Sequence, residues 1–125
     1  MIYNESYNNC NNIFVFGSNR DGVHGKGAAR QARDHWGATF GVGEGRSGMS
    51  YAIPTKSRWQ DKKGLPLAKI EQSVDKFLAY AAEHPEFTFL VTRIGCGYAG
   101  YTDADIAPMF KGAPGNCVLP KEWTK

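Results

Sequence analysis

The segment Ile13-Phe-Val-Phe-Gly-Ser-Asn-Arg-Asp-Gly-Val-His-Gly-Lys-Gly-Ala-Ala29 changes from an apolar run to a glycine-rich loop and then to a helix start. Its first four residues are apolar without a break, which is typical of a strand buried on both faces. Gly17-Ser-Asn19 ends this strand, and a helix is expected over 28–36, with Gly37 as its stop. The segment therefore predicts a strand, a polar glycine loop and a helix in immediate succession.

The rest of the chain continues this alternation of strands and helices. Apolar residues at helical spacing predict an amphipathic helix over 67–81. Thr102 is expected to cap a short helix that ends near Phe110. Strands are expected at 51–53, closed by Pro54, at 87–91 and at 116–119. This order favours an α/β fold in which helices cover the faces of a mostly parallel sheet.

Length and composition limit the architecture and the partners. The 125 residues fit one domain, expected over 13–125, with 1–12 as an N-terminal tail or edge strand. The net charge of +3 suits a nucleotide ligand and does not require a nucleic-acid polymer. No apolar run approaches the roughly 20 residues of a membrane span, and no signal peptide is recognisable. We therefore expect no membrane partner.

The three cysteines, Cys10, Cys96 and Cys117, include no Cys-x-x-Cys pair. An odd number without such a pair disfavours a disulfide framework and a structural zinc site. A reducing cytoplasm is therefore the expected location, and neither a metal nor a cofactor is expected. The sequence leaves the oligomeric state open.

The chain contains more glycine than an average protein of its length. The chain has 15 glycines, whereas average usage predicts about nine. They cluster over 22–27, 41–48 and 95–100. Clustered glycine indicates backbone in unusual dihedral regions or backbone that another group approaches closely.

A second loop repeats the design of the first. Thr92-Arg-Ile-Gly-Cys-Gly-Tyr-Ala-Gly100 follows an apolar strand and precedes a helix start. Backbone amides at helix N-termini and in glycine loops suit phosphate, and ligands of open α/β sheets bind at the carboxyl ends of strands. Two such loops are expected to hold one diphosphate, provided that Gly25 and Gly97 lie on the same side of the sheet. The alternative is a pair of tight turns without a ligand.

The first loop differs from the common nucleotide motifs. Gly25-x-Gly27 is followed by Arg30 where a dinucleotide fingerprint has its third glycine, and no acidic residue ends a second strand at the expected distance. The Gly-Lys-[Ser/Thr] ending of a P-loop is also missing. These differences disfavour both a Rossmann dinucleotide site and a P-loop.

Three segments resemble parts of one known family, the macro domains. Arg93-Ile-Gly-Cys-Gly-Tyr-Ala-Gly100 resembles the Arg-Ile-Gly-Cys-Gly-Leu-Asp-Gly loop of their terminal ADP-ribose protein glycohydrolase branch. Tyr51-Ala-Ile-Pro-Thr-Lys56 resembles the Tyr-Leu-Ile-Thr-Lys-Lys segment of that branch, and the segment 19–29 resembles the first macro-domain loop. The opening Val15-Phe-Gly-Ser-Asn19 is similar to that of small phage and bacterial macro-domain-like proteins.

The resemblance implies a three-layer α/β/α fold with a mixed, mostly parallel sheet and an ADP-ribose cleft at its carboxyl edge. The first loop would line the distal ribose, and residues 95–100 would surround the diphosphate. The ligand-binding residues implied in this way are Gly17, Ser18, Asn19, His24, Gly25, Lys26, Gly27, Ala28, Thr55, Arg93, Ile94, Gly95, Cys96, Gly97, Tyr98, Ala99 and Gly100.

The resemblance also implies candidate catalytic residues. In the glycohydrolase branch a lysine attacks the ribose C1 with help from an aspartate in the glycine loop, and Lys56 matches the lysine. Ala99 stands at the aspartate position, and alanine cannot act as an acid or base. Asn19 and Asp21 are the remaining candidates, with Asp103 a further possible substitute for the aspartate.

Two functions follow from these observations. The first is a module that binds ADP-ribose or a related nucleotide. The second is an ADP-ribosyl hydrolase that removes ADP-ribose from protein, nucleic acid or a small adduct. Ala99 favours binding. A general interaction domain without a small ligand is a third alternative, which the glycine loops disfavour.

Overall fold

Strand β1 (Asn12–Asn19) lies at the centre of a five-stranded sheet in a computed structural model that describes residues 11–97 and 99–124. The sheet order is β2-β3-β1-β4-β5. The other strands are β2 (Gly45–Ser47), β3 (Ser50–Lys56), β4 (Thr88–Val91) and β5 (Cys117–Val118). The helices are α1 (Gly27–His35), α2 (Leu67–Glu83) and α3 (Asp103–Ile106), with 3-10 turns at Ala107–Phe110 and Lys121–Trp123.

Each face of β1 builds one of two cores, because successive side chains of a strand point to opposite faces. Ile13 and Val15 are fully buried against the core under α2. Phe14 and Phe16 point the other way, into the smaller core under α1, where Phe14 stacks on Trp36 with ring centroids 5.1 Å apart. The uninterrupted apolar run 13–16 is therefore explained by the helices that cover both faces of the sheet.

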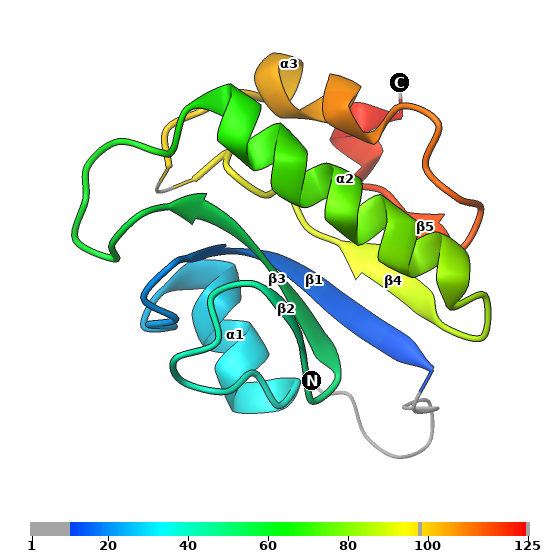
Figure 1. Ribbon diagram of the computed structural model, residues 1–125, viewed down its shortest axis with the longest axis horizontal. Coiled ribbons are helices and arrows are strands. Elements are labelled where there is room, and N and C mark those ends of the chain that lie inside the picture. The colour runs from blue at the N-terminus through cyan, green and yellow to red at the C-terminus, as the bar shows by residue number, and fades with distance from the viewer. Residues whose placement is uncertain (1–10, 98, 125) are drawn as a thin grey trace.

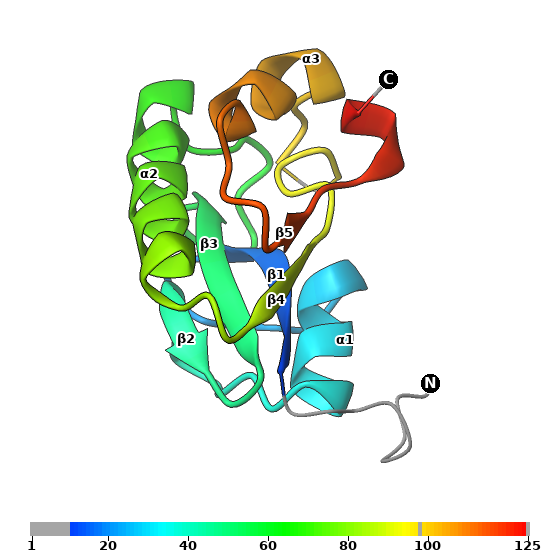
Figure 2. The same ribbon diagram turned by 90° about the vertical axis from the view of Figure 1, so that its right-hand side faces the viewer.

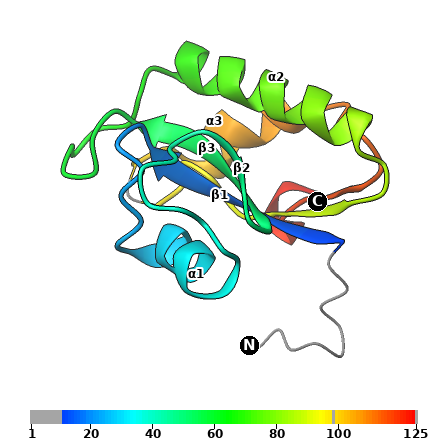
Figure 3. The same cartoon turned by 60° about the horizontal axis from the view of Figure 1, so that its bottom comes forward.

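The helices complete a three-layer α/β/α sandwich. Helix α1 covers one face of the sheet, and α2 and α3 cover the other (Figures 1 and 3). Turned by 90°, the same view shows the sheet edge-on between these layers (Figure 2). Within the described part of the chain, no helix combines the length and apolar character needed to cross a membrane.

Parallel pairing sets the direction of the central strands. β1 pairs in parallel with β3 and with β4, β4 pairs in parallel with β5, and β2 alone is antiparallel. The carboxyl ends of β1, β3 and β4 therefore meet at one edge of the sheet. The mixed, mostly parallel α/β fold expected from the sequence is confirmed.

Several element boundaries differ from the sequence prediction. β3 does not end before Pro54 but continues to Lys56. A proline is tolerated there because β2 pairs with β3 only as far as Ala52, which leaves Pro54 with one neighbouring strand. β1 starts at Asn12, one residue before the expected domain start. Residues 1–10 of the expected tail lie outside the described residues.

Removal of the Phe77 ring tests the packing of α2 on the sheet. Phe77 is fully buried and touches the rings of Tyr51, Phe89 and Phe110. Phe77→Ala should lower the free energy of unfolding by about 3–5 kcal/mol in urea denaturation, because it leaves a cavity. The exposed neighbour variant Lys76→Ala should change it by less than about 0.5 kcal/mol. A loss below about 1 kcal/mol for Phe77→Ala would contradict this packing.

Candidate functional site

A cleft of about 950 Å³ opens at the edge where the central strands end. The ends of β1 and β3, the N-terminus of α1 and the loop after β4 surround it. Its lining residues are Gly17, Ser18, Asn19, Val23, Gly25, Lys26, Gly27, Ala28, Ala29, Thr55, Lys56, Trp59, Gln60, Asp61, Lys62, Thr92, Arg93, Ile94, Gly95, Cys96, Gly97 and Ala99. Gly25 and Gly97 thus lie on the same side of the sheet, as the two-loop hypothesis requires.

The ends of β1 and β3 form the floor of the cleft. Thr55 is buried, and its hydroxyl donates to the carbonyl of Ser18 at 3.2 Å. The pairing of these strands shifts register between Ser18 and Asn19, so that Asn19 lies opposite Lys56. A Cβ added at Gly17 would lie only 3.4 Å from the amide nitrogen of Gly95, which shows how closely the loop after β4 approaches β1.

The Asn19 side chain holds the first loop in shape. Its amide nitrogen donates to the carbonyl of Val23 at 2.9 Å, and its oxygen accepts from the Val23 amide at 3.0 Å. Both polar atoms of this buried side chain are therefore used by the backbone of the loop. Asn19 lines the cleft as a structural brace of the β1–α1 turn.

The glycines at 41–48 support the first loop from behind and do not line the cleft. The Gly41 amide donates to the carbonyl of Gly22 at 2.9 Å, and the Ser18 hydroxyl donates to the carbonyl of Gly43. A Cβ at Gly43 would lie 2.3 Å from the carbonyl oxygen of Asn19, which no side chain could tolerate. Close backbone packing thus explains glycine at position 43, whereas Gly41 has a positive φ of +92° and a Cβ there would meet nothing within 4 Å.

The N-terminus of α1 faces the cleft without a capping side chain. Residues 25–29 line the cleft, and Lys26, at the N-cap position, makes no side-chain cap hydrogen bond. The first turn also contains no acidic residue. Amides of a first helical turn have no partners within the helix, and the helix dipole favours an anion there. The start of α1 therefore presents a positive backbone surface to the cleft.

The loop after β4 turns sharply at the opposite wall of the cleft. Gly95 adopts a left-handed conformation with φ of +74°, and its carbonyl accepts from the Tyr101 amide at 2.9 Å. The Cys96 amide donates to the carbonyl of Arg93 at 3.2 Å. Gly97 is exposed, and a Cβ built on it would meet no atom within 4 Å. Gly97 therefore borders open space, and packing alone does not require glycine there.

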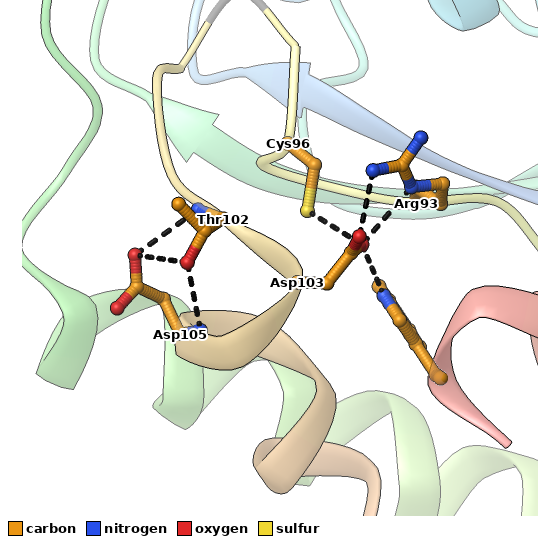
Figure 4. Close-up of polar contacts among 6 residues, drawn as sticks. Arg93, Cys96, Thr102, Asp103 and Asp105 are labelled. Atoms are coloured by element: carbon orange, nitrogen blue, oxygen red, sulfur yellow. Dashed lines mark hydrogen bonds and ion pairs between the residues drawn. The ribbon is translucent and has the colours of Figure 1, made fainter. Parts of the chain in front are cut away.

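Asp103 ties this loop to the C-terminal part of the chain. Its carboxylate accepts from Arg93 Nε at 2.9 Å and from Arg93 Nη2 at 2.7 Å. The side chains of Arg93 and Cys96 both point towards it (Figure 4). The indole nitrogen of Trp123 donates to the same carboxylate at 2.7 Å. Hydrogen bonds from Arg93 and Trp123 lower the pKa of Asp103 to about 2. Asp103 is therefore ionised at neutral pH and has a structural partner for its charge.

Cys96 lines the cleft as a neutral thiol. Burial, together with the neighbouring Asp103 carboxylate, raises the pKa of the Cys96 thiol to about 11. Nucleophilic cysteines depend on a lowered pKa and the thiolate form. This environment favours a packing role for Cys96 over a nucleophilic one.

The segment after β3 forms a further wall of the cleft, which was not predicted from the sequence. Trp59, Gln60, Asp61 and Lys62 belong to it and line the cleft. Its far end is anchored, because the Gly64 amide donates to the carbonyl of Ala99 at 3.1 Å. One sequence signal could have identified this wall: it is the connection that leaves β3, which ends at the same edge as the two glycine loops.

Some predicted site residues do not line the cleft. Asp21 is exposed in the first loop, and Gly100 is exposed beyond the second. His24 is buried with 2% exposure and packs edge-on against Phe16, with centroids 5.2 Å apart. Burial lowers the pKa of His24. Tyr98 lies outside the described residues.

The cleft is positively charged. Three lysines and Arg93 line it, whereas Asp61 is the one carboxylate among the described lining residues. Asp61 forms an ion pair with Arg58 at 3.6 Å, and Arg93 is neutralised by Asp103. Lys26, Lys56 and Lys62 are the three lysines of the lining, so the lining has more basic than acidic side chains. Residues 11–97 and 99–124 contain no group of three His, Cys, Asp or Glu side chains that could hold a metal ion.

The chain is similar in structure to a solved structure of Thermosipho africanus DarTG in complex with ADP-ribose. The TM-score is 0.62, and the two sequences are 16% identical. The similarity covers 95% of this chain and 40% of DarTG, so the chain spans less than half the length of that protein. No known family profile and no curated protein matches the sequence. At the level of the fold, the likeness confirms the macro-domain-like architecture that the sequence resemblance implied.

The low pKa of Asp103 predicts a pH-dependent contribution to stability. The carboxylate has a pKa of about 2 in the folded chain and about 3.9 when unfolded. Its stabilisation is therefore present above pH 4 and disappears as the pH falls towards 2. Asp103→Asn should be less stable than the wild type at pH 7, and the difference in urea midpoint should shrink below pH 4.

Asp75→Asn is the matched control, since it removes an exposed carboxylate from α2. It should leave the urea midpoint at pH 7 close to that of the wild type. A difference between wild type and Asp103→Asn that stays constant from pH 7 to pH 3 would contradict the assignment.

Proposed function

We propose that this chain binds ADP-ribose, or a nucleotide that contains it, in the cleft between its two glycine loops. The observation that carries the proposal is that Gly25 and Gly97, which are 97 − 25 = 72 positions apart in the chain, line one cleft together with the start of α1. Two sets of backbone amides can then contact adjacent phosphates of a single diphosphate.

The size and charge of the cleft fit such a ligand. Its volume of about 950 Å³ lies at the upper end of the range for sites that hold small molecules and cofactors. Lysine side chains supply positive charge to the lining, and the amides of the first turn of α1 supply partial positive charge where that helix starts. A dianionic diphosphate with a ribose on each side suits a cleft of this volume that is lined by basic side chains and helix-start amides.

We assign the residue roles from the resemblance to the macro domains, for those residues that line the cleft. Gly17, Ser18 and Asn19, with Thr55 beside them, contact the distal ribose; residues 25–28 border this ribose and also offer the amides at the start of α1 to the adjacent phosphate. Residues 93–97 and Ala99 surround the diphosphate. His24 supports the first loop from inside the smaller core, where it packs on Phe16. These assignments give the backbone the main binding role and give most side chains a supporting one.

Binding without turnover is favoured over hydrolysis because the candidate catalytic groups are already engaged. The amide of Asn19 is bound to Val23 at both of its polar atoms. Lys56 Nζ donates to the carbonyl of Trp59 at 3.0 Å, and Asp21 lies outside the cleft. General acid–base catalysis needs a group that can gain or lose a proton beside the reacting bond, and Ala99 cannot supply one.

An alanine at Gly97 tests the binding proposal. The added Cβ meets no protein atom within 4 Å, so the fold should tolerate it, but it occupies space beside the diphosphate. Gly97→Ala should weaken ADP-ribose binding by about tenfold or more, or ~1.4 kcal/mol, in isothermal titration calorimetry. Gly25→Ala should act in the same direction for the same reason.

Gly115→Ala is the matched control. A Cβ at Gly115 also meets open space, but the residue lies away from the cleft. It should leave the affinity for ADP-ribose within about twofold of the wild type. Failure of the wild type to bind ADP-ribose would overturn the proposal, and so would equal affinities of Gly97→Ala, Gly25→Ala and Gly115→Ala.

Incubation with ADP-ribosylated protein and ADP-ribosylated DNA tests for turnover. We expect the wild type to release no free ADP-ribose above the uncatalysed background in chromatography of the products. Steady release that Lys56→Ala abolishes, and that the exposed α2 variant Lys69→Ala retains, would instead establish a hydrolase that uses Lys56.

A further inference from the structure

We propose that Trp59 is a stacking platform for a planar base ring of the ligand, and that it gives the cleft its preference for nucleotides over simple sugar phosphates. This inference rests on the function proposed above and identifies a residue that sets the specificity of the same site. It starts from an indole that lines the cleft and is half exposed to solvent.

The exposure of Trp59 is unusual in this chain. Within the described residues, three large apolar side chains are exposed: Phe40 at 74%, Val118 at 52% and Trp59 at 51%. Trp59 is the only one of these three that lines the cleft. The other tryptophans have protein surroundings, since Trp36 is buried and Trp123 donates to Asp103. An aromatic face left open in a concave site is typical of a ligand contact.

The turn that carries Trp59 is held by bonds that do not use the indole. Lys56 Nζ donates to the Trp59 carbonyl at 3.0 Å. The Asp61 amide donates to the Arg58 carbonyl at 3.1 Å, and the Asp61 carboxylate accepts from the Arg58 amide at 3.0 Å. The backbone is thus positioned before any ligand binds, and the ring remains available for one.

The same segment is tied to the loop that we assign to the diphosphate. The Gly64 amide donates to the carbonyl of Ala99 at 3.1 Å, and the Leu65 amide donates to the carbonyl of Thr55 at 2.7 Å. The Tyr101 hydroxyl donates to the Leu65 carbonyl at 2.6 Å. These bonds join the end of the segment that carries Trp59 to the proposed phosphate-binding loop, so the indole and this loop border the same cleft.

The chemistry of this wall matches a nucleotide. Lys56 and Lys62 line the cleft beside Trp59 and supply positive charge, while the indole supplies a flat apolar face. Stacking of a base on an aromatic side chain contributes roughly 5- to 150-fold to affinity and depends little on which base is present. Two rings of such a ligand could stack on Trp59. One is the adenine of ADP-ribose, and the other is a ring attached to its terminal ribose, as nicotinamide is in NAD⁺.

Three Trp59 variants and three ligands test the proposal. Trp59→Ala, Trp59→Phe and Trp59→Leu are titrated with ADP-ribose, NAD⁺ and ribose 5-phosphate, the last of which has no base ring. We expect Trp59→Ala to weaken the binding of a ring-containing ligand by about 5-fold or more and that of ribose 5-phosphate by less than about twofold. Trp59→Phe should retain most of the affinity, whereas Trp59→Leu, which is apolar but not planar, should not.

The ligands also identify the source of the ring. Equal weakening of ADP-ribose and NAD⁺ assigns it to adenine, and weakening of NAD⁺ alone assigns it to the group on the terminal ribose. If the wild type does not bind NAD⁺, the affinity of Trp59→Ala for ADP-ribose alone decides whether Trp59 stacks on adenine. Phe40→Ala, which removes an exposed aromatic ring outside the cleft, is the control and should bind every ligand as the wild type does.

Two results would overturn the proposal. One is unchanged affinity of Trp59→Ala for both ring-containing ligands, and the other is an equal loss for ribose 5-phosphate. Because the wild type is measured alongside, its failure to bind ADP-ribose would instead overturn the proposed function and this inference with it. Thermal melts of each variant, expected within about 2 °C of the wild type because Trp59 is exposed, separate binding effects from unfolding.

Discussion

Parallel pairing of β1 with β4 is the constraint on which the rest of the structure depends. The register runs from Asn12 opposite Thr88 to Val15 opposite Val91, so both strands end at the same edge of the sheet. The loop that leads to α1 and the loop that leads to α3 must therefore leave the sheet side by side. This pairing brings the loop after β4 so close to β1 that a Cβ added at Gly17 would lie 3.4 Å from the amide nitrogen of Gly95. An antiparallel arrangement would have placed the two glycine loops at opposite edges.

The polar side chains around the cleft mainly hold its walls, which leaves the backbone to meet a ligand. Asn19 braces the first loop through Val23, and Asp103 holds the second through Arg93. Such a division suits recognition of phosphate, because amides fixed in position lose little entropy when they bind it. It also explains why residue types that suggest catalysis in the sequence have structural partners in the folded chain.

The sequence predicted those features that depend on local patterns. The apolar run 13–16 indicated a strand covered on both faces, and helical spacing located α2. The continuation of β3 through Pro54 was not predictable locally, since it depends on where β2 stops pairing. The family resemblance implied that His24 contacts the ligand, yet His24 is buried and packs on Phe16. The role of Trp59 likewise depends on the return of its segment to Ala99, a long-range contact without a local signature.

The joint use of both loops can be measured directly by the amide chemical shifts of ¹⁵N-labelled protein during titration with ADP-ribose. The largest shifts should occur together in two separate stretches, residues 25–29 at the start of α1 and residues 95–97 after β4. Both stretches should titrate with one dissociation constant, because a single diphosphate contacts them. Shifts confined to one stretch, or centred on the far end of the sheet near β2 and the start of β1, would contradict a cleft shared by the two loops.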